Sequence, residues 1–339
     1  MVSYDLVLSS PYPNFDFFGH RMRELCGQMN LSFFMTGPVW VKEFLQKLQL
    51  REIEVQVLLD LGADQSISED PYLLLAQEVK RQGGYVIDDP DKTGIMAHKG
   101  LFHQMLLENQ IPVPETAMVS RCELDSFKIT DEIKAQVGAP FVVKPAWGWS
   151  GQGVIIDGVS EDDLRKSAAE APNSDSFLIQ RRLNPKDLDG RSGWFRMFHV
   201  FGEIIPCWWN PTNHEYHLVT RAQQRYYQLD PLKRITRGIA RVSKMKKFTS
   251  EVCLNEDGQF FAVDYLNAQP DMNPKSLYPN GVPDEVVQHI VERLVWEVMH
   301  LVKRKQGSFH ENLDKSDGDG LGWRGLEQQA PTPSANFQA

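Results

Sequence analysis

The sequence of 339 residues has few cysteines, no excess of positive charge and no long hydrophobic segment. Its four cysteines, Cys26, Cys122, Cys207 and Cys253, are far apart and form no CxxC pair, which argues against a disulfide framework or a zinc site. The net charge is -9, so nucleic acid is not expected as a partner. No stretch is long enough to span a membrane, and Asp5 stands where a secretory signal would carry basic residues. We therefore expect a soluble cytoplasmic protein that binds neither nucleic acid nor a membrane.

Two common nucleotide-binding signatures are also missing. No glycine-rich dinucleotide fingerprint follows the first predicted strand, and the sequence has neither the HRD nor the DFG motif of protein kinases. The glycine-rich stretch KPAWGWSGQGV (144–154) carries its lysine before the glycines, whereas a Walker loop carries it after them. Glycines permit unusual dihedrals, and converging backbone amides can bind phosphate. The stretch is therefore predicted to be a phosphate-binding flap between two antiparallel strands.

Short apolar runs alternate with helical patterns over residues 1–95. Strands are expected at YDLVLSS (4–10), LSFFMTG (31–37), VQVLLDLGAD (55–64) and GYVIDDP (84–90). Strict alternation of strands and helices predicts a parallel sheet covered on both faces. After a closing helix at 283–304, residues 306–339 are rich in Gly, Ser, Asp, Gln and Pro, which predicts a disordered tail.

The stretch SEVCLNEDGQFFAVDYLN (250–267) predicts a hairpin that turns at Glu256-Asp257-Gly258. Such a hairpin would bring Glu251, Asp264 and Asn267 together, and three oxygen ligands suit Mg²⁺. Acidic residues and asparagine are also ordinary turn residues, so the hairpin taken alone leaves both interpretations open.

Five motifs in order resemble the ATP-grasp superfamily over roughly residues 90–300. They are a helical lysine (Lys99), the strand FVVKP with its glycine flap, the hinge strand FLIQRRL (177–183), an arginine heading the next strand (Arg196), and the acidic hairpin. The glutathione-synthetase-like and ribosomal-protein glutamate-ligase branches are the most similar. The resemblance implies an α/β (α+β) fold with an N-terminal α/β domain (1–95), a flap subdomain (96–183) and a metal-hairpin subdomain (184–305).

The resemblance also implies roles for individual residues. Lys99 and Lys144 would neutralise phosphates, the flap backbone would close over the β- and γ-phosphates, Gln180 would face the adenine amino group, and Arg196 would stabilise the transferred phosphoryl group. The implied residues are Lys99, Lys144, Gly148, Ser150, Gly151, Gly153, Gln180, Arg181, Leu183 and Asp187 for ATP, Arg196 and Lys144 for catalysis, and Glu251, Asp264 and Asn267 for two Mg²⁺ ions, with Mn²⁺ as an alternative.

The implied activity is an ATP-dependent carboxylate–amine ligase that forms an acyl phosphate and releases ADP and phosphate. Its substrates would be small-molecule or peptide carboxylates and amines, and a homodimer is left open. A small-molecule kinase and a non-catalytic nucleotide-binding regulator remain alternatives. The segment Asp264-Tyr-Leu-Asn267 departs from the family pattern Glu-x-Asn, which keeps the regulator open and leaves one or two metals undecided. Gln180 stands where glutamate is frequent in the family.

Two aromatic or polar groups have no role fixed by the resemblance. Trp147 and Trp149 in the flap would either pack against the domain or form a lid over the ligand. His214 and His217 lack the HExxH spacing of a helical zinc site and are interpreted as part of a polar loop.

Overall fold

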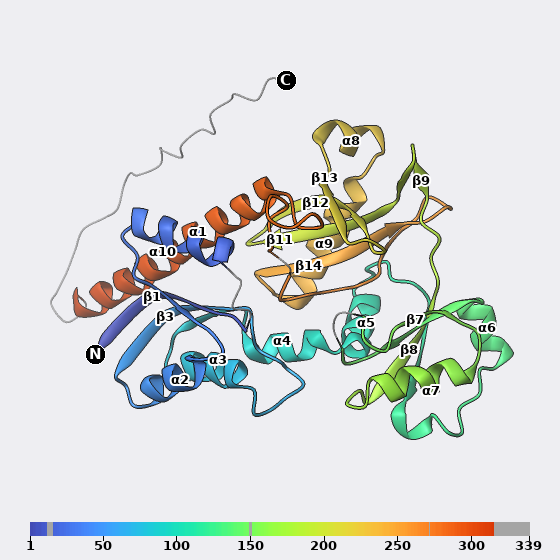
Figure 1. The fold of residues 1–339 in the computed structure, drawn as a ribbon, viewed down its shortest axis with the longest axis horizontal. Coiled ribbons are helices and arrows are strands. Elements are labelled where there is room, and N and C mark those ends of the chain that lie inside the picture. Colours follow the sequence, from blue (N-terminus) through green and yellow to red (C-terminus); the bar gives the residue numbers. More distant parts are fainter. Residues whose placement is uncertain (12–15, 149–150, 271, 315–339) are drawn as a thin grey trace. The chain divides into compact units, whose positions relative to one another are not determined.

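The structure is a computed structural model that describes residues 1–11, 16–148, 151–270 and 272–314 (Figure 1). Residues 1–302 form one compact unit, and a second unit begins at Lys303. Over the described residues, the first unit contains two four-stranded sheets, one five-stranded sheet and a two-stranded ribbon. None of the described helices is both long enough and apolar enough to cross a lipid bilayer.

The N-terminal sheet is parallel throughout, and its strands follow the order β2-β1-β3-β4. Its elements are β1 (Val2–Ser9), α1 (Asp16–Gln28), β2 (Phe33–Thr36), α2 (Val41–Gln49), β3 (Ile53–Asp60), α3 (Pro71–Arg81) and β4 (Tyr85–Ile87). Successive side chains of a strand point to opposite faces. Leu6 and Leu8 accordingly share a core with α1 and with the long helix α10 (Asp284–Asp314), while Val7 packs with α2 and α3. The predicted parallel sheet with two covered faces is confirmed.

A smaller, antiparallel sheet follows in the order β5-β8-β6-β7. Its elements are α4 (Pro90–Ala97), α5 (Lys99–Glu108), β5 (Thr116–Ser120), the 3-10 turn η1 (Arg121–Glu123), α6 (Asp131–Val137), β6 (Phe141–Pro145), β7 (Ile155–Gly158), α7 (Glu161–Glu170) and β8 (Ser176–Arg181). Phe141, Val143 and Ile179 form its core with α6 and α7. The glycine-rich stretch joins β6 to β7, as predicted, and these strands are antiparallel.

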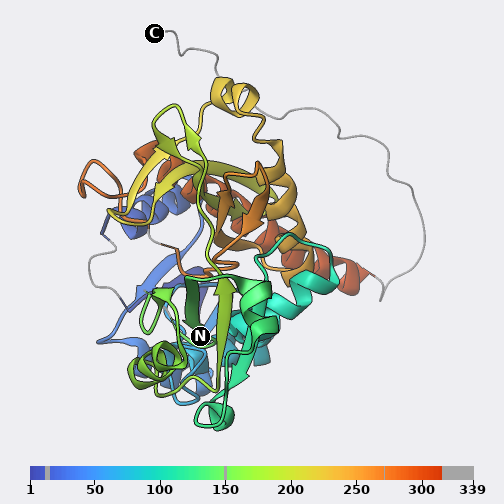
Figure 2. The same ribbon diagram turned by 90° about the vertical axis from the view of Figure 1, so that its right-hand side faces the viewer.

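The larger sheet is antiparallel and follows the order β13-β12-β11-β14-β15. Its elements are the ribbon β9 (Asp187–Leu188) and β10 (Arg191–Ser192), then β11 (Trp194–Val200), β12 (Glu203–Asn210), β13 (Glu215–Leu218), α8 (Arg221–Tyr226), α9 (Asp230–Ser243), β14 (Lys247–Leu254) and β15 (Phe260–Ala262). One face packs on α9 and the other on α10. In both Figure 1 and Figure 2 the smaller sheet (green) lies below the larger one (yellow to orange).

A buried lysine links the larger sheet to the N-terminal sheet. The Lys247 ammonium donates to the Ala268 carbonyl oxygen, and the Asp88 carboxylate accepts from the Lys247 amide at 2.9 Å. Burial lowers the pKa of Lys247 to about 8, while Asp88 and Asp60 work to raise it. This contact fixes the segment that follows Asn267 relative to β3 and β4.

The end of α10 corrects one sequence-based prediction. The tail was expected to lose structure from residue 306, but the α10 backbone remains helical to Asp314. The helical hydrogen-bonding pattern of 283–304 therefore continues past the point where the composition becomes polar. The rest of the predicted tail lies outside the described residues.

Candidate functional site

Charged residues from three sheet strands and one helix form the candidate site. Arg196 in β11 lies directly opposite Glu251 in β14, and its Nη1 atom is 2.5 Å from Glu251 Oε1 and 3.9 Å from Asp264 Oδ2. Lys99 begins α5, and Lys144 lies near the end of β6. Asp264 acts electrostatically on both lysines. The structure thus brings together all five charged residues that the sequence analysis proposed for phosphates, metal and catalysis.

The hairpin that carries Asp264 is irregular. Val252 pairs with Ala262 in regular register, and Thr249 pairs with Asn267 further along. The returning strand has two more residues between these pairs than β14 has. Extra residues of this kind form β-bulges, which change the direction of side chains and are common next to active sites. The additional residue between Asp264 and Asn267, relative to the family pattern, is therefore accommodated by bulging of this strand.

The Lys99 and Lys144 side chains are part-buried, and both are bonded to protein oxygens. The Lys99 ammonium donates to the Gly148 carbonyl oxygen at 2.5 Å, and Lys144 donates to Gln180 Oε1 at 2.8 Å and to the Val263 carbonyl oxygen at 3.0 Å. Burial lowers the pKa of Lys144 to about 8, and the charge of Lys99 adds to the decrease. Burial also lowers the pKa of Lys99. Two part-buried ammonium groups that are close enough to influence each other favour an anionic ligand.

Arg196 is buried and oriented by aromatic residues as well as by carboxylates. Its guanidinium lies 5.6 Å from the ring centroid of Trp209, and the indole N–H of Trp194 donates to Glu251 at 2.8 Å. Among the described residues, the Arg196 Nε atom is buried without a hydrogen-bond partner. Burial works to lower the pKa of Arg196, but the neighbouring carboxylates hold it above its usual value. The guanidinium is therefore a permanent cation held in place beside the acidic pair.

The proposed metal ligands were tested against this geometry. Arg196 makes one ion pair with Glu251 and a longer one with Asp264, so both carboxylates lie within reach of a single cation. Asn267 Oδ1 accepts from the Gln269 amide at 2.9 Å and retains a second lone pair. Within the described residues, no three His, Cys, Asp or Glu side chains converge as a metal site. Two carboxylates and one amide oxygen fit Mg²⁺ completed by phosphate and water, and this assignment stays a prediction.

The flap glycines do not all serve the same purpose. Gly148, Gly151 and Gly153 all have positive φ values, 153°, 73° and 70°. A Cβ atom on Gly151 would meet no atom of the described residues within 4 Å, but one on Gly153 would lie 2.9 Å from a proline side chain. Gly153 also accepts a hydrogen bond from Ser167 Oγ at 2.6 Å. Close packing against α7 therefore explains Gly153, and Ser150 lies outside the described residues.

The structure decides between packing and lid roles for one of the two flap tryptophans. Trp147 meets the His98 ring edge-on, with centroids 5.2 Å apart, and its amide donates to Ser174 Oγ at 3.1 Å. His98 Nε2 lies 3.0 Å from Asp175 Oδ1, which fixes the ring. These contacts favour the packing interpretation for Trp147, and Trp149 lies outside the described residues.

The hinge residues differ in whether their polar groups are free to contact ATP. The Gln180 side chain is buried, accepts from Lys144 and uses its NH₂ group for two further hydrogen bonds, so a contact with the adenine amino group would require it to leave them. The Arg181 amide donates to a neighbouring carbonyl oxygen, whereas the Leu183 amide has no partner in the described part of the chain. Asp187 accepts the amide of the residue three positions later at 2.9 Å. Roles for Arg181, Leu183 and Asp187 toward ATP stay predictions.

Sequence reasoning missed several residues of the site. Tyr265 and His103 are hydrogen-bonded beneath Lys144, and Trp194 orients Glu251. The sequence did contain one indication of the role of Tyr265, because the extra residue after Asp264 predicts a bulge at this position. His214 has a φ of 60° in the turn between β12 and β13, and His217 lies in β13. His214 therefore lies in a turn, as expected for a polar loop, whereas the loop expected at His217 is wrong because this residue pairs with Trp208 in the sheet.

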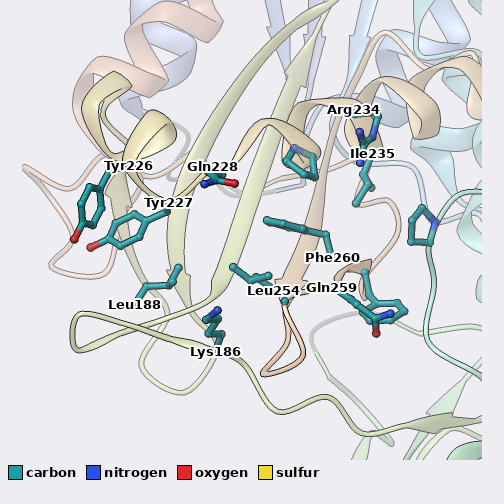
Figure 3. Close-up of a pocket in the computed structure, with 14 residues that line it drawn as sticks. Lys186, Leu188, Tyr226, Tyr227, Gln228, Arg234, Ile235, Leu254, Gln259 and Phe260 are labelled. Atoms are coloured by element: carbon teal, nitrogen blue, oxygen red, sulfur yellow. The ribbon is translucent and has the colours of Figure 1, made fainter.

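A cavity of about 750 Å³ lies away from these residues (Figure 3). Figure 3 shows Leu254 and Phe260 near its centre, with Tyr226 and Tyr227 on one side and Arg234 on the other. The first two belong to the core under α9, which is the opposite face of the sheet from Glu251 because side chains alternate. Over the described residues, its lining contains none of the charged residues of the candidate site.

Solved structures with a similar fold include several ligases, among them the ATP-grasp ligase PsnB. The D-alanine–D-alanine ligase from Bacillus anthracis complexed with ATP has a TM-score of 0.62 at 12% identity and covers 90% of this chain and 100% of its own. D-cycloserine synthetase DcsG has a TM-score of 0.61 at 13% identity, with 86% and 99% covered. The ligase PsnB complexed with precursor peptide PsnA2 and AMPPNP has a TM-score of 0.55 at 12% identity, with 88% and 99% covered. No family model and no curated protein matches the chain. The ATP-grasp fold predicted from the order of motifs is confirmed.

Proposed function

The chain has the ATP-grasp fold, and we propose that it is an ATP-dependent ligase that joins a carboxylate to an amine. The observation that carries the proposal is the pair of part-buried ammonium groups, Lys99 and Lys144, beside Arg196 and two carboxylates. Cations removed from water are costly unless they are paired, and burial lowers the pKa of both lysines. A polyphosphate would supply the missing negative charge.

The reaction follows from the charges around this site. A carboxylate oxygen of the first substrate attacks the γ-phosphorus of ATP, and the bond to the β–γ bridging oxygen breaks to release ADP. The amine nitrogen of the second substrate attacks the resulting acyl phosphate, the acyl C–O bond breaks, and phosphate leaves as the nitrogen loses a proton. Both steps carry negative charge on the phosphoryl group. Arg196, Lys99 and Lys144 are the cations that would stabilise it.

Glu251, Asp264 and Asn267 would hold Mg²⁺ at the phosphate end. When bound, the ion would neutralise the charge that develops between the β- and γ-phosphates. The solved structures of similar fold agree with this cofactor set, since one PsnB complex contains a minimal precursor, Mg and ADP and the D-alanine–D-alanine ligase contains ATP. At 12% sequence identity, the similarity to these structures supports the fold only, and the substrates of this chain must be found by experiment.

Backbone groups of the hinge would recognise the base. The Leu183 amide is unpaired in the described chain, and the Arg181 carbonyl precedes it by two residues. One donor and one acceptor along a strand edge match the edge of adenine. This arrangement would not require the Gln180 side chain, which is already engaged by Lys144.

Product analysis tests the proposal. The protein is incubated with Mg²⁺, ATP and a panel of amino acids and dipeptides, and free phosphate, ADP and AMP are measured with mass spectrometry of the acceptors. The ligase yields ADP, phosphate and an amide. The Lys144→Ala variant should lose turnover, whereas Lys134→Ala, on an exposed lysine, should keep it.

The alternatives give different products. A phosphorylated acceptor without free phosphate would identify a kinase, and ATP binding without turnover over the whole panel would favour a regulator. AMP and pyrophosphate would contradict the acyl-phosphate route.

A further inference from the structure

A buried hydrogen-bond chain runs beneath the two lysines. Gln180 Nε2 donates to Tyr265 Oη at 2.8 Å and to Thr116 Oγ1 at 3.0 Å, and Tyr265 Oη lies 2.6 Å from His103 Nδ1. Lys144 donates to the other end of the Gln180 amide at 2.8 Å. The exposed fractions of Tyr265, Gln180 and His103 are 3%, 1% and 2%. Water therefore cannot replace these partners.

The direction of every bond in this chain is determined by its ends. An ammonium only donates, so the Gln180 atom that faces Lys144 must be the carbonyl oxygen, and the amide NH₂ must face Tyr265 and Thr116. The Thr116 hydroxyl donates its hydrogen bond to the Pro114 carbonyl oxygen at 2.9 Å. The Tyr265 hydroxyl accepts from Gln180, so its hydrogen is left for His103 Nδ1. This requires neutral His103, and burial lowers its pKa to about 4.

The hydrogen-bond chain joins the elements that carry Lys99, Lys144 and Asp264. His103 lies one turn beyond Lys99 in α5, Gln180 is the penultimate residue of β8, and Tyr265 follows Asp264 in the bulged segment. In a regular strand, the alternation of side chains would place Tyr265 on the face away from this core. The bulge shifts the alternation and directs the Tyr265 side chain into the core instead. The departure from the family's metal motif therefore provides the hydroxyl on which the chain depends.

We propose that Tyr265 is a positioning residue, which orients the Gln180 amide so that its carbonyl oxygen holds the Lys144 ammonium at the phosphate end of the site. The inference rests on the proposed function, because it assigns Lys144 to ATP. Without the hydroxyl, one Gln180 N–H and His103 Nδ1 are left buried and unpaired. The amide can then rotate, and an NH₂ group facing Lys144 would repel it. The loss should appear in ATP affinity as well as in stability.

The test compares two tyrosine-to-phenylalanine variants. Tyr72 is a matched control, because its hydroxyl is buried and donates to the Ser10 carbonyl oxygen at 3.2 Å in the N-terminal domain. Both variants should unfold at a lower temperature. Only Tyr265→Phe should raise the Kd for ATP, by about fivefold to tenfold, the effect of one lost hydrogen bond near a charge. Equal Kd values for Tyr265→Phe and the parent, within twofold, would overturn the proposal.

A double-variant cycle with Gln180→Met tests the route of the effect. If Tyr265 acts through Gln180, adding Tyr265→Phe to Gln180→Met should weaken ATP binding no further. Additive losses would show that Tyr265 acts independently, and the proposal would be wrong.

Histidine side-chain NMR gives a readout that does not need ATP. The His103 signal, assigned with His103→Gln, should show an unprotonated Nδ1 and a protonated Nε2, and should shift in Tyr265→Phe but not in Tyr72→Phe. A protonated Nδ1 would contradict the direction of the chain. Correct NMR results in a protein that does not bind ATP would instead overturn the proposed function and leave the orientation of Gln180 intact.

Discussion

ATP binding should be accompanied by proton uptake in the mildly alkaline range. Lys144 has a pKa of about 8, because burial and the nearby charge of Lys99 both lower it. A bound polyphosphate would place negative charge beside the ammonium and raise this pKa toward or above the usual value of about 10.4. A group whose pKa rises on binding takes up a proton, so ATP affinity must fall as the pH rises through about 8.

The magnitude follows from the pKa of Lys144. At pH 8 about half of the ligand-free protein is deprotonated at this residue, so binding should take up about 0.5 proton there and only about 0.1 at pH 7. Integrated over the range, the Kd should increase about tenfold between pH 7 and pH 9. Lys99 would add to both effects, since burial lowers its pKa as well. The phosphates of ATP titrate near pH 6 and contribute little above pH 7.

Titration calorimetry at pH 8 in buffers of different ionisation enthalpy measures the uptake directly. The matched variant is Lys144→Arg, which keeps the positive charge but stays protonated throughout this range. It should lose at least half of the uptake and most of the pH dependence. Lys247 also has a pKa of about 8, but its charged partners are Asp60 and Asp88, so its titration cancels between the free and bound states. Uptake below about 0.1 proton in the parent, or equal uptake in Lys144→Arg, would refute the assignment of Lys144 to ATP.

Three further predictions concern the hairpin, the flap and the buried Lys247. Asp264→Asn should slow turnover about 100-fold while weakening ATP binding much less, because charge develops mainly in the transition state; comparing kcat with the calorimetric Kd checks this. Gly153→Ala should destabilise the fold by about 1–3 kcal/mol more than Gly151→Ala in urea unfolding, because only Gly153 is both at positive φ and closely packed. Lys247→Met should cost about 1–3 kcal/mol in the same assay, since it removes the ammonium's hydrogen bond to the Ala268 carbonyl oxygen and the positive charge that acts on buried Asp88; unchanged stability would contradict this reasoning.

The parts of the site that could be predicted from the sequence are those that depend on short sequence motifs. The strand-Lys-Pro-glycine motif around Lys144 fixes a lysine at a strand end and a flap after it, and both are present. Arg196 and Glu251 were predicted from separate motifs, and strand pairing places them opposite each other. Alternating apolar runs were likewise enough to predict the N-terminal parallel sheet.

The parts that sequence could not predict depend on contacts between distant segments. Tyr265 and His103 are separated by 162 positions, and neither has a local pattern that indicates the other. The orientation of the Gln180 side chain depends on Lys144, which only the sheet register brings close. Gly153 belonged to a glycine-rich run whose members looked equivalent, and only its closeness to α7 distinguishes it.

Several groups of the candidate site are bonded to one another. Arg196 is paired with Glu251, and Lys99 with the Gly148 carbonyl of the flap. These are the groups assigned to the phosphoryl group, the metal and the closing flap. ATP would therefore replace some of these internal partners, and the energy of those contacts would be subtracted from its affinity. Because Glu251 and Arg196 are released together, metal binding at Glu251 and contact of Arg196 with the phosphoryl group should be energetically coupled. A double-variant cycle on ATP affinity, Glu251→Gln with Arg196→Met, should then show a coupling of about 1 kcal/mol or more, whereas additive effects would mean that the two residues act separately.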